Sequence, residues 1–326
     1  MTLTVAKNRE ALPQLAHQDE LLVTASIKAA VIYAALFDYP LTIGELVKYQ
    51  VGTRYDAASI LAALELAPEL RDFISEEDGF YFPSHRPELP QKRKARAEKS
   101  ATLWWRARLY GRLAAMLPFV RMVAVTGALA VDNVGARPDI DLLVVARPGR
   151  VWICRRGLIL LVRVARLLGD DLCPNYILSS KALKLDQRDF FTAHELAQMV
   201  PLSGDGLYRR MLGANRWATR YLPAAFPNLP QTGENVRRKM TISERILASR
   251  VFDKWEAWEL ARLRDRLGRK IGTASEVVCS AEQCKGHTGL HRQSITTTYA
   301  QKLSAAALEP VAEFLDMLNS ANNVGR

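Results

Sequence analysis

The sequence predicts an α+β protein, and three observations support that class. Apolar residues recur at helical spacing towards both ends of the chain, in segments such as SIKAAVIYAALF and ISERILASRVFDKWEAWELARLRDRLG. The middle of the chain instead contains short apolar runs that are typical of strands, namely VRMVAVTG, DIDLLVVA and NYILS. A third signal is Asp78-Gly79 between alternating apolar residues, which predicts a β-hairpin.

Composition and charge are typical of a globular protein with room for about two or three domains. The chain has 326 residues, 49% of them hydrophobic and 24% charged, and its net charge of +11 favours polyanionic partners such as nucleic acid or nucleotide phosphates. The four cysteines are too few and too scattered for a disulfide framework. The N-terminus lacks a signal pattern, and no apolar segment is long enough to span a bilayer. We therefore expect a cytoplasmic protein with no membrane partner.

The N-terminal part of the chain predicts a small domain over residues 26–85, preceded by a polar lead-in over residues 1–25. One helix leads to a second helix that is capped by Thr42, with Glu45 completing a capping box. A third helix begins after Asp56, and the hairpin follows it. Three helices and a hairpin are the elements of a winged helix-turn-helix, so we expect a winged-helix-like domain.

The third helix of this domain lacks the side chains that usually read DNA. It contains no Arg or Lys between Asp56 and Ala67 and carries the acidic Glu65. DNA-reading helices normally present Arg, Lys, Asn or Gln to phosphates and base edges. We therefore favour protein contact for this domain, and expect any nucleic-acid binding to be weak, sequence-tolerant and strongly salt-dependent.

Three further regions follow. Residues 86–117 predict a basic helical connector, whose cations form either a solvated face or a contact with a phosphate backbone. Residues 118–204 predict a mixed-sheet core with a helix over residues 151–168. Residues 205–326 predict a mainly helical C-terminal region, with a last helix near Ser294 to Leu318. The helix of the core carries an arginine stripe, which is usually solvent-facing but is also suited to the entrance of a phosphate site: Arg155, Arg156, Arg163 and Arg166.

Two aspartates suggest the chemistry of the core. Side chains alternate along a strand, so Asp139 and Asp141 point to one face while Ile140 points to the other. Two adjacent carboxylates repel each other, and a divalent cation between them removes that repulsion. Upstream, Gly127 ends an apolar strand and lets the backbone approach a phosphate group. Together these residues predict a metal-phosphate site, and the alternative is a strand-end pair of aspartates in solvent.

The same residues resemble a known motif. Gly127-Ala128, followed about a dozen residues later by Asp139-Ile140-Asp141 between hydrophobic strands, resembles the DNA polymerase β nucleotidyltransferase superfamily over roughly residues 118 to 180. The layout of most of the chain also resembles bacterial nucleotidyltransferase-like proteins with an N-terminal winged helix. That wider resemblance rests on the segments FDYPLT, PFVRMVAVTG, CPNYILS, TAHELAQMVPL and CKGH.

This resemblance implies a central nucleotidyltransferase core in which Asp139 and Asp141 hold Mg²⁺ or Mn²⁺. Gly127 would lie beside the triphosphate of the NTP substrate. Ala128 stands where the family often has a phosphate-binding Ser, so a side-chain donor is lost while the backbone N–H remains. The third catalytic carboxylate of the family has no clear match. Its candidate is Asp171.

Asn175 is a weaker candidate ligand of the same site, through its amide oxygen. The resemblance implies transfer of a nucleoside monophosphate to an acceptor whose class stays open: a protein, an RNA or a small molecule. The alternative is a catalytically degenerate protein of the same fold that regulates by binding nucleic acid or a partner protein.

The segment CSAEQCKGHTGLHR allows three interpretations. Cys279, Cys284, His287 and His291 have a spacing that superficially suggests zinc, although the glycines between them argue against a regular helix. Lys285 and His287 would instead suit contact with a nucleotide phosphate. The third interpretation is a polar loop packed on the core.

The His194-Glu195 pair lies in TAHELAQMV, which predicts a helix. No second His follows at the spacing of a zincin, so the pair does not indicate a zinc protease. The sequence assigns it no other role.

Overall fold

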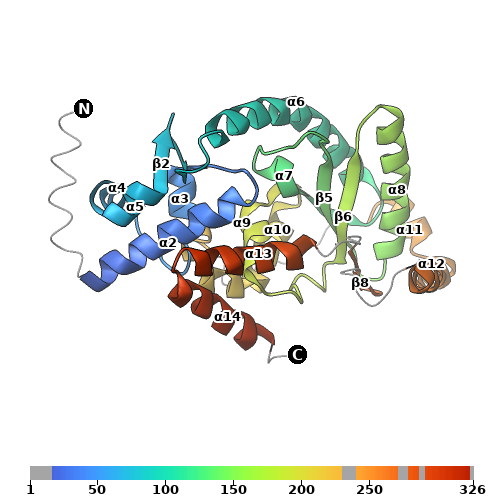
Figure 1. Cartoon of the computed structure of the whole chain (residues 1–326). Coiled ribbons are helices and arrows are strands. Elements are labelled where there is room, and N and C mark those ends of the chain that lie inside the picture. The colour runs from blue at the N-terminus through green and yellow to red at the C-terminus, as the bar shows by residue number, and fades with distance from the viewer. Residues whose placement is uncertain (1–16, 230–239, 271–277, 286–290, 324–326) are drawn as a thin grey trace.

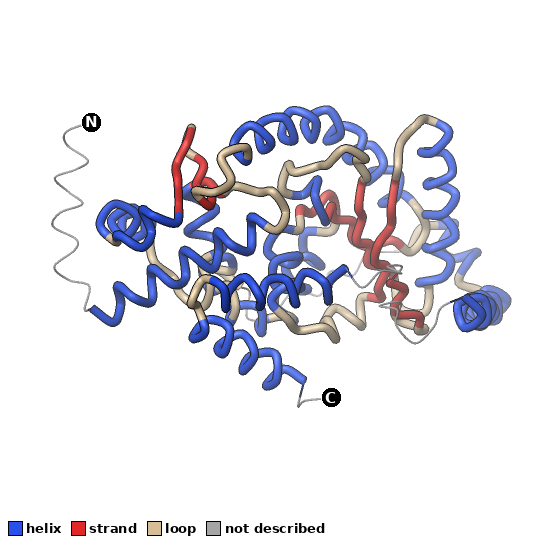
Figure 2. Tube along the Cα trace, viewed as in Figure 1, coloured by secondary structure: helices blue, strands red, loops and turns tan. Residues whose placement is uncertain are grey.

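The computed structural model describes residues 17–229, 240–270, 278–285 and 291–323. Over these residues the chain has the predicted α+β class, with a small antiparallel sheet near the N-terminus, a larger mixed sheet in the middle and helices around both (Figures 1 and 2). None of the described helices is both long and apolar enough to cross a membrane.

The N-terminal part contains the predicted helices and hairpin. Asp56 caps the third predicted helix, and Thr42 and Glu45 form the predicted capping box. The lead-in is shorter than predicted, because the first helix begins at His17 and already buries Val23. The elements are α2 (His17–Ala35), β1 (Leu41–Thr42), α3 (Ile43–Tyr49), α4 (Ala57–Leu66), α5 (Pro68–Phe73), β2 (Ile74–Glu77) and β3 (Phe80–Pro83).

The hairpin turns at the predicted dipeptide. Glu77 pairs with Phe80, and the two residues between them have positive φ, 55° for Asp78 and 80° for Gly79. Positive φ at both positions matches the right-handed twist of the flanking strands. The short strand β1 then pairs with β3 and completes the sheet order β1-β3-β2.

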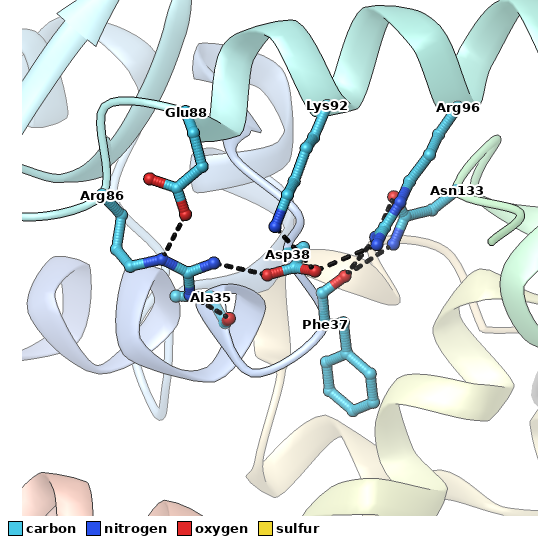
Figure 3. A network of polar contacts seen from close by, with 8 residues as sticks. All are labelled: Ala35, Phe37, Asp38, Arg86, Glu88, Lys92, Arg96 and Asn133. Atoms are coloured by element: carbon cyan, nitrogen blue, oxygen red, sulfur yellow. Dashed lines mark hydrogen bonds and ion pairs between the residues drawn. The ribbon is translucent and has the colours of Figure 1, made fainter. Parts of the chain in front are cut away.

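The basic connector forms the long helix α6 (Leu89–Met116), and its first turns bind the N-terminal helices (Figure 3). Asp38 accepts from Arg86 at 2.5 Å and from Arg96 at 2.9 Å, and lies 3.5 Å from Lys92. Arg93 is buried, with its guanidinium 3.6 Å from the centre of the Tyr39 ring. The interpretation of this stretch as a solvated face is therefore wrong for its first turns, where the cations bind the N-terminal helices.

The central sheet has the strand order β7-β4-β5-β6-β9-β8. β5 and β6 are parallel and are joined by α8, whereas the other neighbours are antiparallel. The strands, with the two helices that connect β4 to β5 and β5 to β6, are β4 (Val120–Thr126), α7 (Gly127–Ala130), β5 (Ile140–Ala146), α8 (Val151–Leu167), β6 (Leu172–Ser179), β7 (Val200–Ser203), β8 (Val278–Cys279) and β9 (Gln283–Lys285). The sequence did not predict β7, β8 or β9, so the mainly helical C-terminal region also supplies two strands to this sheet.

Both faces of the sheet are covered, so its strands are apolar on both sides. Leu142 and Val144 of β5 pack in the layer that contains α6 and α8, and the alternate residues Leu143 and Val145 pack against helices of the opposite layer. Asp141 belongs to the second set by this alternation. The site residues therefore face the layer that contains α2 and α9.

The remaining helices close that layer. The last predicted helix is two helices, because Ala307 has a φ of 52° and interrupts it. Tyr299 donates to the Ala29 carbonyl at 3.1 Å, so the C-terminal helices pack beside α2 (Figure 1). The helices are α9 (Phe190–Gln198), α10 (Asp205–Ala214), the 3-10 turns η2 (Arg216–Arg220) and η3 (Pro223–Ala225), α11 (Ile242–Leu247), α12 (Arg250–Lys270), α13 (His291–Ala305) and α14 (Glu309–Asn323).

The arginine stripe of α8 is only partly solvent-facing. Arg156 donates to Glu259 of α12 at 2.9 Å, and Arg155 lies 3.9 Å from the same carboxylate. Arg163 and Arg166 are exposed. Half of the stripe therefore binds α12, contrary to the solvent-facing interpretation.

Candidate active site

The two aspartates lie where β5 begins. Ile140 is buried in the layer of α6 and α8, and Asp141 is on the opposite face, in register with Thr126 of β4 and Cys173 of β6. Asp139 directly precedes the strand and is half-buried. Its negative charge raises the pKa of Asp141, so the two carboxylates interact.

Gly127 lies against the Asp141 carboxylate. Its φ is +66°, and a Cβ at this position would lie 2.3 Å from Asp141 Oδ2. Both the backbone conformation and the space therefore require glycine. Ala128 follows in the short helix α7, and both residues border the same cavity as Asp141.

A bulge in β6 brings Asn175 to the aspartate. Between Asp141 and Leu143 of β5, the partner residues on β6 advance from Cys173 to Tyr176, so β6 has one extra residue. Such bulges re-aim side chains. The Asn175 oxygen accepts from the Cys173 thiol at 2.8 Å, and its amide hydrogen-bonds Asp141. Burial raises the pKa of the Cys173 thiol to about 12, so this thiol is a neutral donor.

The environment disfavours the ionised form of Asp141. Burial, followed by the charge of Asp139, raises its pKa from 3.8 to about 7, although the hydrogen bond from Asn175 acts in the opposite direction. The charges of Glu195 and Asp171 raise it further. Several carboxylates thus act on Asp141.

Asp171 lies at the start of β6, next to the aspartate pair. Its backbone carbonyl accepts from the Ile140 amide at 2.8 Å, and its side chain is exposed. It is not among the residues that line the cavity, whereas Asn175 is. Asp171 as a third catalytic carboxylate stays a prediction.

A cavity of about 350 Å³ opens beside Asp141. Small-molecule sites commonly have volumes of roughly 300–1,000 Å³. One wall comes from the N-terminal part of the chain, with Tyr33, Tyr39 and Tyr49, and another from α9. The N-terminal helices therefore form part of the candidate site.

Glu195 is the site residue that the sequence did not reveal. It lies on α9, borders the cavity, and its charge raises the pKa values of both Asp141 and Tyr176. No motif indicated it, because α9 is about 50 residues from the aspartates in the chain and only the packing of α9 brings them together. The sole local signal was a carboxylate within the predicted helix TAHELAQMV.

His194, its neighbour, also borders the cavity. Its imidazole is buried between Tyr33, Tyr49 and Phe190, with ring centres 4.1 to 5.5 Å away, and its Nδ1 lies 3.1 Å from the Phe190 carbonyl. Burial lowers its pKa to about 3, and the charge of Lys48 acts in the same direction. His194 is therefore neutral at physiological pH.

Two cations border the same cavity. Lys285 on β9 donates to Gln187 at 2.5 Å, and Arg292 on α13 pairs with Asp189. Lys285 thus reaches the candidate site, because β9 pairs with β6. Its predicted partner His287 lies outside the described residues.

The zinc interpretation lies partly outside the described residues too. Cys279 and Cys284 face each other across β8 and β9, but His287 and the side chain of His291 are not described. Within the described part of the chain, no group of three or more His, Cys, Asp or Glu side chains is placed to hold a metal ion.

Comparisons with protein-family models, with curated proteins and with solved structures found no significant match to this chain.

Proposed function

We propose that this protein is a metal-dependent nucleotidyltransferase that moves a nucleoside monophosphate from an NTP to an acceptor. One observation carries the proposal: Asp139 and Asp141 begin a buried strand at the edge of a cavity, with Gly127 held against Asp141 where no side chain fits. A strand-end pair with a purely structural role needs neither the cavity nor the glycine.

The donor set suits Mg²⁺ or Mn²⁺. Mg²⁺ in such enzymes is usually bound by one or two carboxylates together with substrate phosphates, so a third protein carboxylate is not required for binding. Burial raises the pKa of Asp141 most, and the charge of Asp139 raises it further. A divalent cation held by Asp139 and Asp141 would offset the repulsion between the two carboxylates. A bound metal would stabilise negative charge on the phosphate oxygens.

The residues around the pair suit a triphosphate and a small acceptor. Lys285 and Arg292 would contribute positive charge for the phosphates. Gly127 and Ala128 would contribute backbone groups close to the phosphates. Glu195 borders the same cavity from α9, and we assign it the role of general base towards the acceptor hydroxyl, in place of a carboxylate on β6. The volume and the aromatic wall favour a small-molecule acceptor over a protein or an RNA end.

The central mixed sheet would be the nucleotidyltransferase core, and residues 26–85 the winged-helix-like domain. Three tyrosines of that domain border the cavity, which supports a role in enclosing the acceptor rather than in reading DNA.

The alternative is a protein that binds a nucleotide without turnover. It is favoured because, in the described part of the chain, no third His, Cys, Asp or Glu side chain is placed to hold a metal ion together with the pair. A panel of NTPs with Mg²⁺ or Mn²⁺, supplemented with mixtures of small hydroxylated metabolites, separates the two by pyrophosphate release. Transfer requires pyrophosphate from the wild type, and none from Glu195→Gln despite retained nucleotide binding. Nucleotide binding without pyrophosphate release would instead show that the protein binds nucleotide without turnover. If Asp139→Asn and Asp141→Asn both bind nucleotide as the wild type does, both functions are refuted.

A further inference from the structure

The face of the molecule away from the cavity carries a second feature, formed by the outer sides of α6 and α8. These helices run antiparallel to each other. Arg106 in the middle of α6 pairs with Asp170 just after α8, whereas Leu117 after α6 lies against Gly157 in the middle of α8. The outward sides of both helices therefore form one continuous surface, called here the α6/α8 face.

Apolar side chains follow this face at helical spacing. On α6 they are Trp105, Leu109, Leu113 and Met116, which recur every three or four residues, and Met116 is 78% exposed. On α8, Leu160, Val164 and Leu167 repeat the pattern, and Leu167 is 87% exposed. Scattered exposed apolar residues need no explanation, but two aligned stripes on neighbouring helices mark an interaction surface.

Arginines are interleaved with these stripes. Arg108 and Arg112 on α6 and Arg163 and Arg166 on α8 are all exposed. From residue 100 to residue 117, and again from residue 151 to residue 168, the sequence contains no Asp, Glu or Lys. Enrichment in Trp, Met and Arg with depletion of Lys, Asp and Glu is the composition of protein–protein interfaces. A lipid surface would be served equally by lysine.

The charge also decides the kind of partner. A second copy of this chain, related by a two-fold axis, would place the same arginine-rich surface against itself. An acidic partner would pair its carboxylates with the guanidinium groups, which bind carboxylates in a bidentate manner. The stripe of α6 from Trp105 to Met116 spans about 16–18 Å at 1.5 Å per residue, the length of three to four helical turns.

We propose that the α6/α8 face binds an amphipathic helix of a partner protein, with leucine-type side chains along its centre and acidic residues along its flanks. The partner helix packs lengthwise on α6 and α8 as a third helix. This inference is independent of the nucleotidyltransferase proposal, because the face shares no residue with the cavity.

The test uses the full-length protein and two synthetic amphipathic peptides of about 20 residues, a length that covers the stripe. Both peptides have the same leucine stripe, one with Glu and the other with Lys on its flanks. Fluorescence anisotropy should show binding of the acidic peptide only. The affinity for the acidic peptide should fall by about tenfold or more in the double variant Arg108→Glu, Arg112→Glu and also in the variant Leu167→Ser, an effect typical of substitutions at interface hot spots.

Matched controls are available elsewhere on the surface. Arg209→Glu on α10 and Met317→Ser on α14 change other exposed side chains away from the face and should leave peptide binding unchanged. Unchanged melting curves would show that the variants are folded. The proposal would be overturned if the acidic peptide failed to bind or if the basic peptide bound equally well. It would also be overturned by preferential binding of the protein to vesicles of phosphatidylglycerol, or by a dimer that Met116→Ser dissociates.

Discussion

Replacement of Asp141 by asparagine separates the charge of the site from its shape. Asparagine has nearly the same size as aspartate, so the contact with Gly127 and the hydrogen bond from Asn175 are retained, while the negative charge is lost. In the folded protein the pKa of Asp141 is raised from 3.8 to about 7, with burial as the largest cause. The substitution therefore replaces an unfavourable ion with a neutral side chain.

The magnitude follows from that pKa difference. A rise of about three units corresponds to about 4 kcal/mol at ~1.36 kcal/mol per unit. This figure is a ceiling, because Asp141 is half-buried and solvent screens its charge. We expect Asp141→Asn to raise the free energy of unfolding by about 1–2 kcal/mol at pH 8, without metal or nucleotide.

The effect must depend on pH in one direction. Between pH 3.8 and about 7 the folded protein keeps the proton of Asp141 while the unfolded chain has lost it, so the contribution of this residue to stability falls as pH rises. Urea unfolding at pH 5 and pH 8 measures this directly. The gain of the variant should be present at pH 8 and much smaller at pH 5.

The same variant tests the function. Calorimetric titration with Mg²⁺ and NTP should show that Asp141→Asn loses metal-dependent nucleotide binding although it is the more stable protein. Asp171→Asn, which changes an exposed carboxylate nearby, should alter stability by less than about 0.5 kcal/mol. A destabilised Asp141→Asn at pH 8 would refute the electrostatic argument, and unchanged nucleotide affinity in the Asp139→Asn, Asp141→Asn double variant would refute the metal-phosphate site.

Three other perturbations have definite expected outcomes. Gly127→Ala should lower the free energy of unfolding more than Gly149→Ala does, by about 1–3 kcal/mol, because both glycines have φ near +67° but only the first meets a neighbour within 4 Å; equal losses in urea would contradict this. His194→Phe should reduce the loss of stability at acid pH. Below pH 6.5 the wild type loses up to about 1.4 kcal/mol of unfolding free energy per pH unit, because His194 binds a proton in the unfolded chain but not in the folded protein, where its imidazole is buried. An unchanged slope of unfolding free energy against pH would show that His194 does not cause this loss. Arg96→Ala should cost about 1–3 kcal/mol, because it removes an ion pair and a carbonyl contact from a half-buried network, whereas Lys94→Ala, at an exposed pair, should cost less than about 0.5 kcal/mol.

Local signals in the sequence predicted local structure well. The capping box of Thr42 and Glu45, the cap at Asp56 and the turn at Asp78 are each set by a few neighbouring side chains, and the structure has all three. The strands β7, β8 and β9 were missed because each has only two to four residues. A segment that short has no recognisable period, and only its pairing with a distant strand defines it.

The candidate site divides in the same way. Gly127, Asp139 and Asp141 lie within 15 residues of one another, so their spacing alone predicted that they meet. Asn175 reaches Asp141 through a bulge that no sequence pattern signalled. Glu195 requires α9 to pack against the sheet, so its place depends on the fold of the whole layer.

The net positive charge of the chain led to an expectation of polyanionic partners, and the first turns of α6 show how such an inference fails locally. Asp38 sits in a turn with a φ of 52° and is reached by Arg86, Lys92 and Arg96 (Figure 3). Burial disfavours its charge, but the hydrogen bond from Arg86 and the two neighbouring cations outweigh burial and hold the pKa of Asp38 below its usual value. These cations therefore already have an acidic partner within the molecule.

The cations of α6 differ along its length, and this difference assigns them different functions. Those of the first turns hold the N-terminal helices against α6, and the same helices supply Tyr33 and Tyr49 to the wall of the cavity. Arg108 and Arg112, near the other end, are exposed among apolar side chains and remain available to an acidic partner. High salt should accordingly weaken partner binding strongly, because exposed charges are screened, and the half-buried Asp38 network much less. Peptide affinity and urea unfolding should each be measured at 0.05 M and 0.5 M NaCl, where the screening length falls from about 14 Å to about 4 Å. An equal salt dependence of peptide affinity and of unfolding free energy would contradict the assignment of different functions to the two groups of cations.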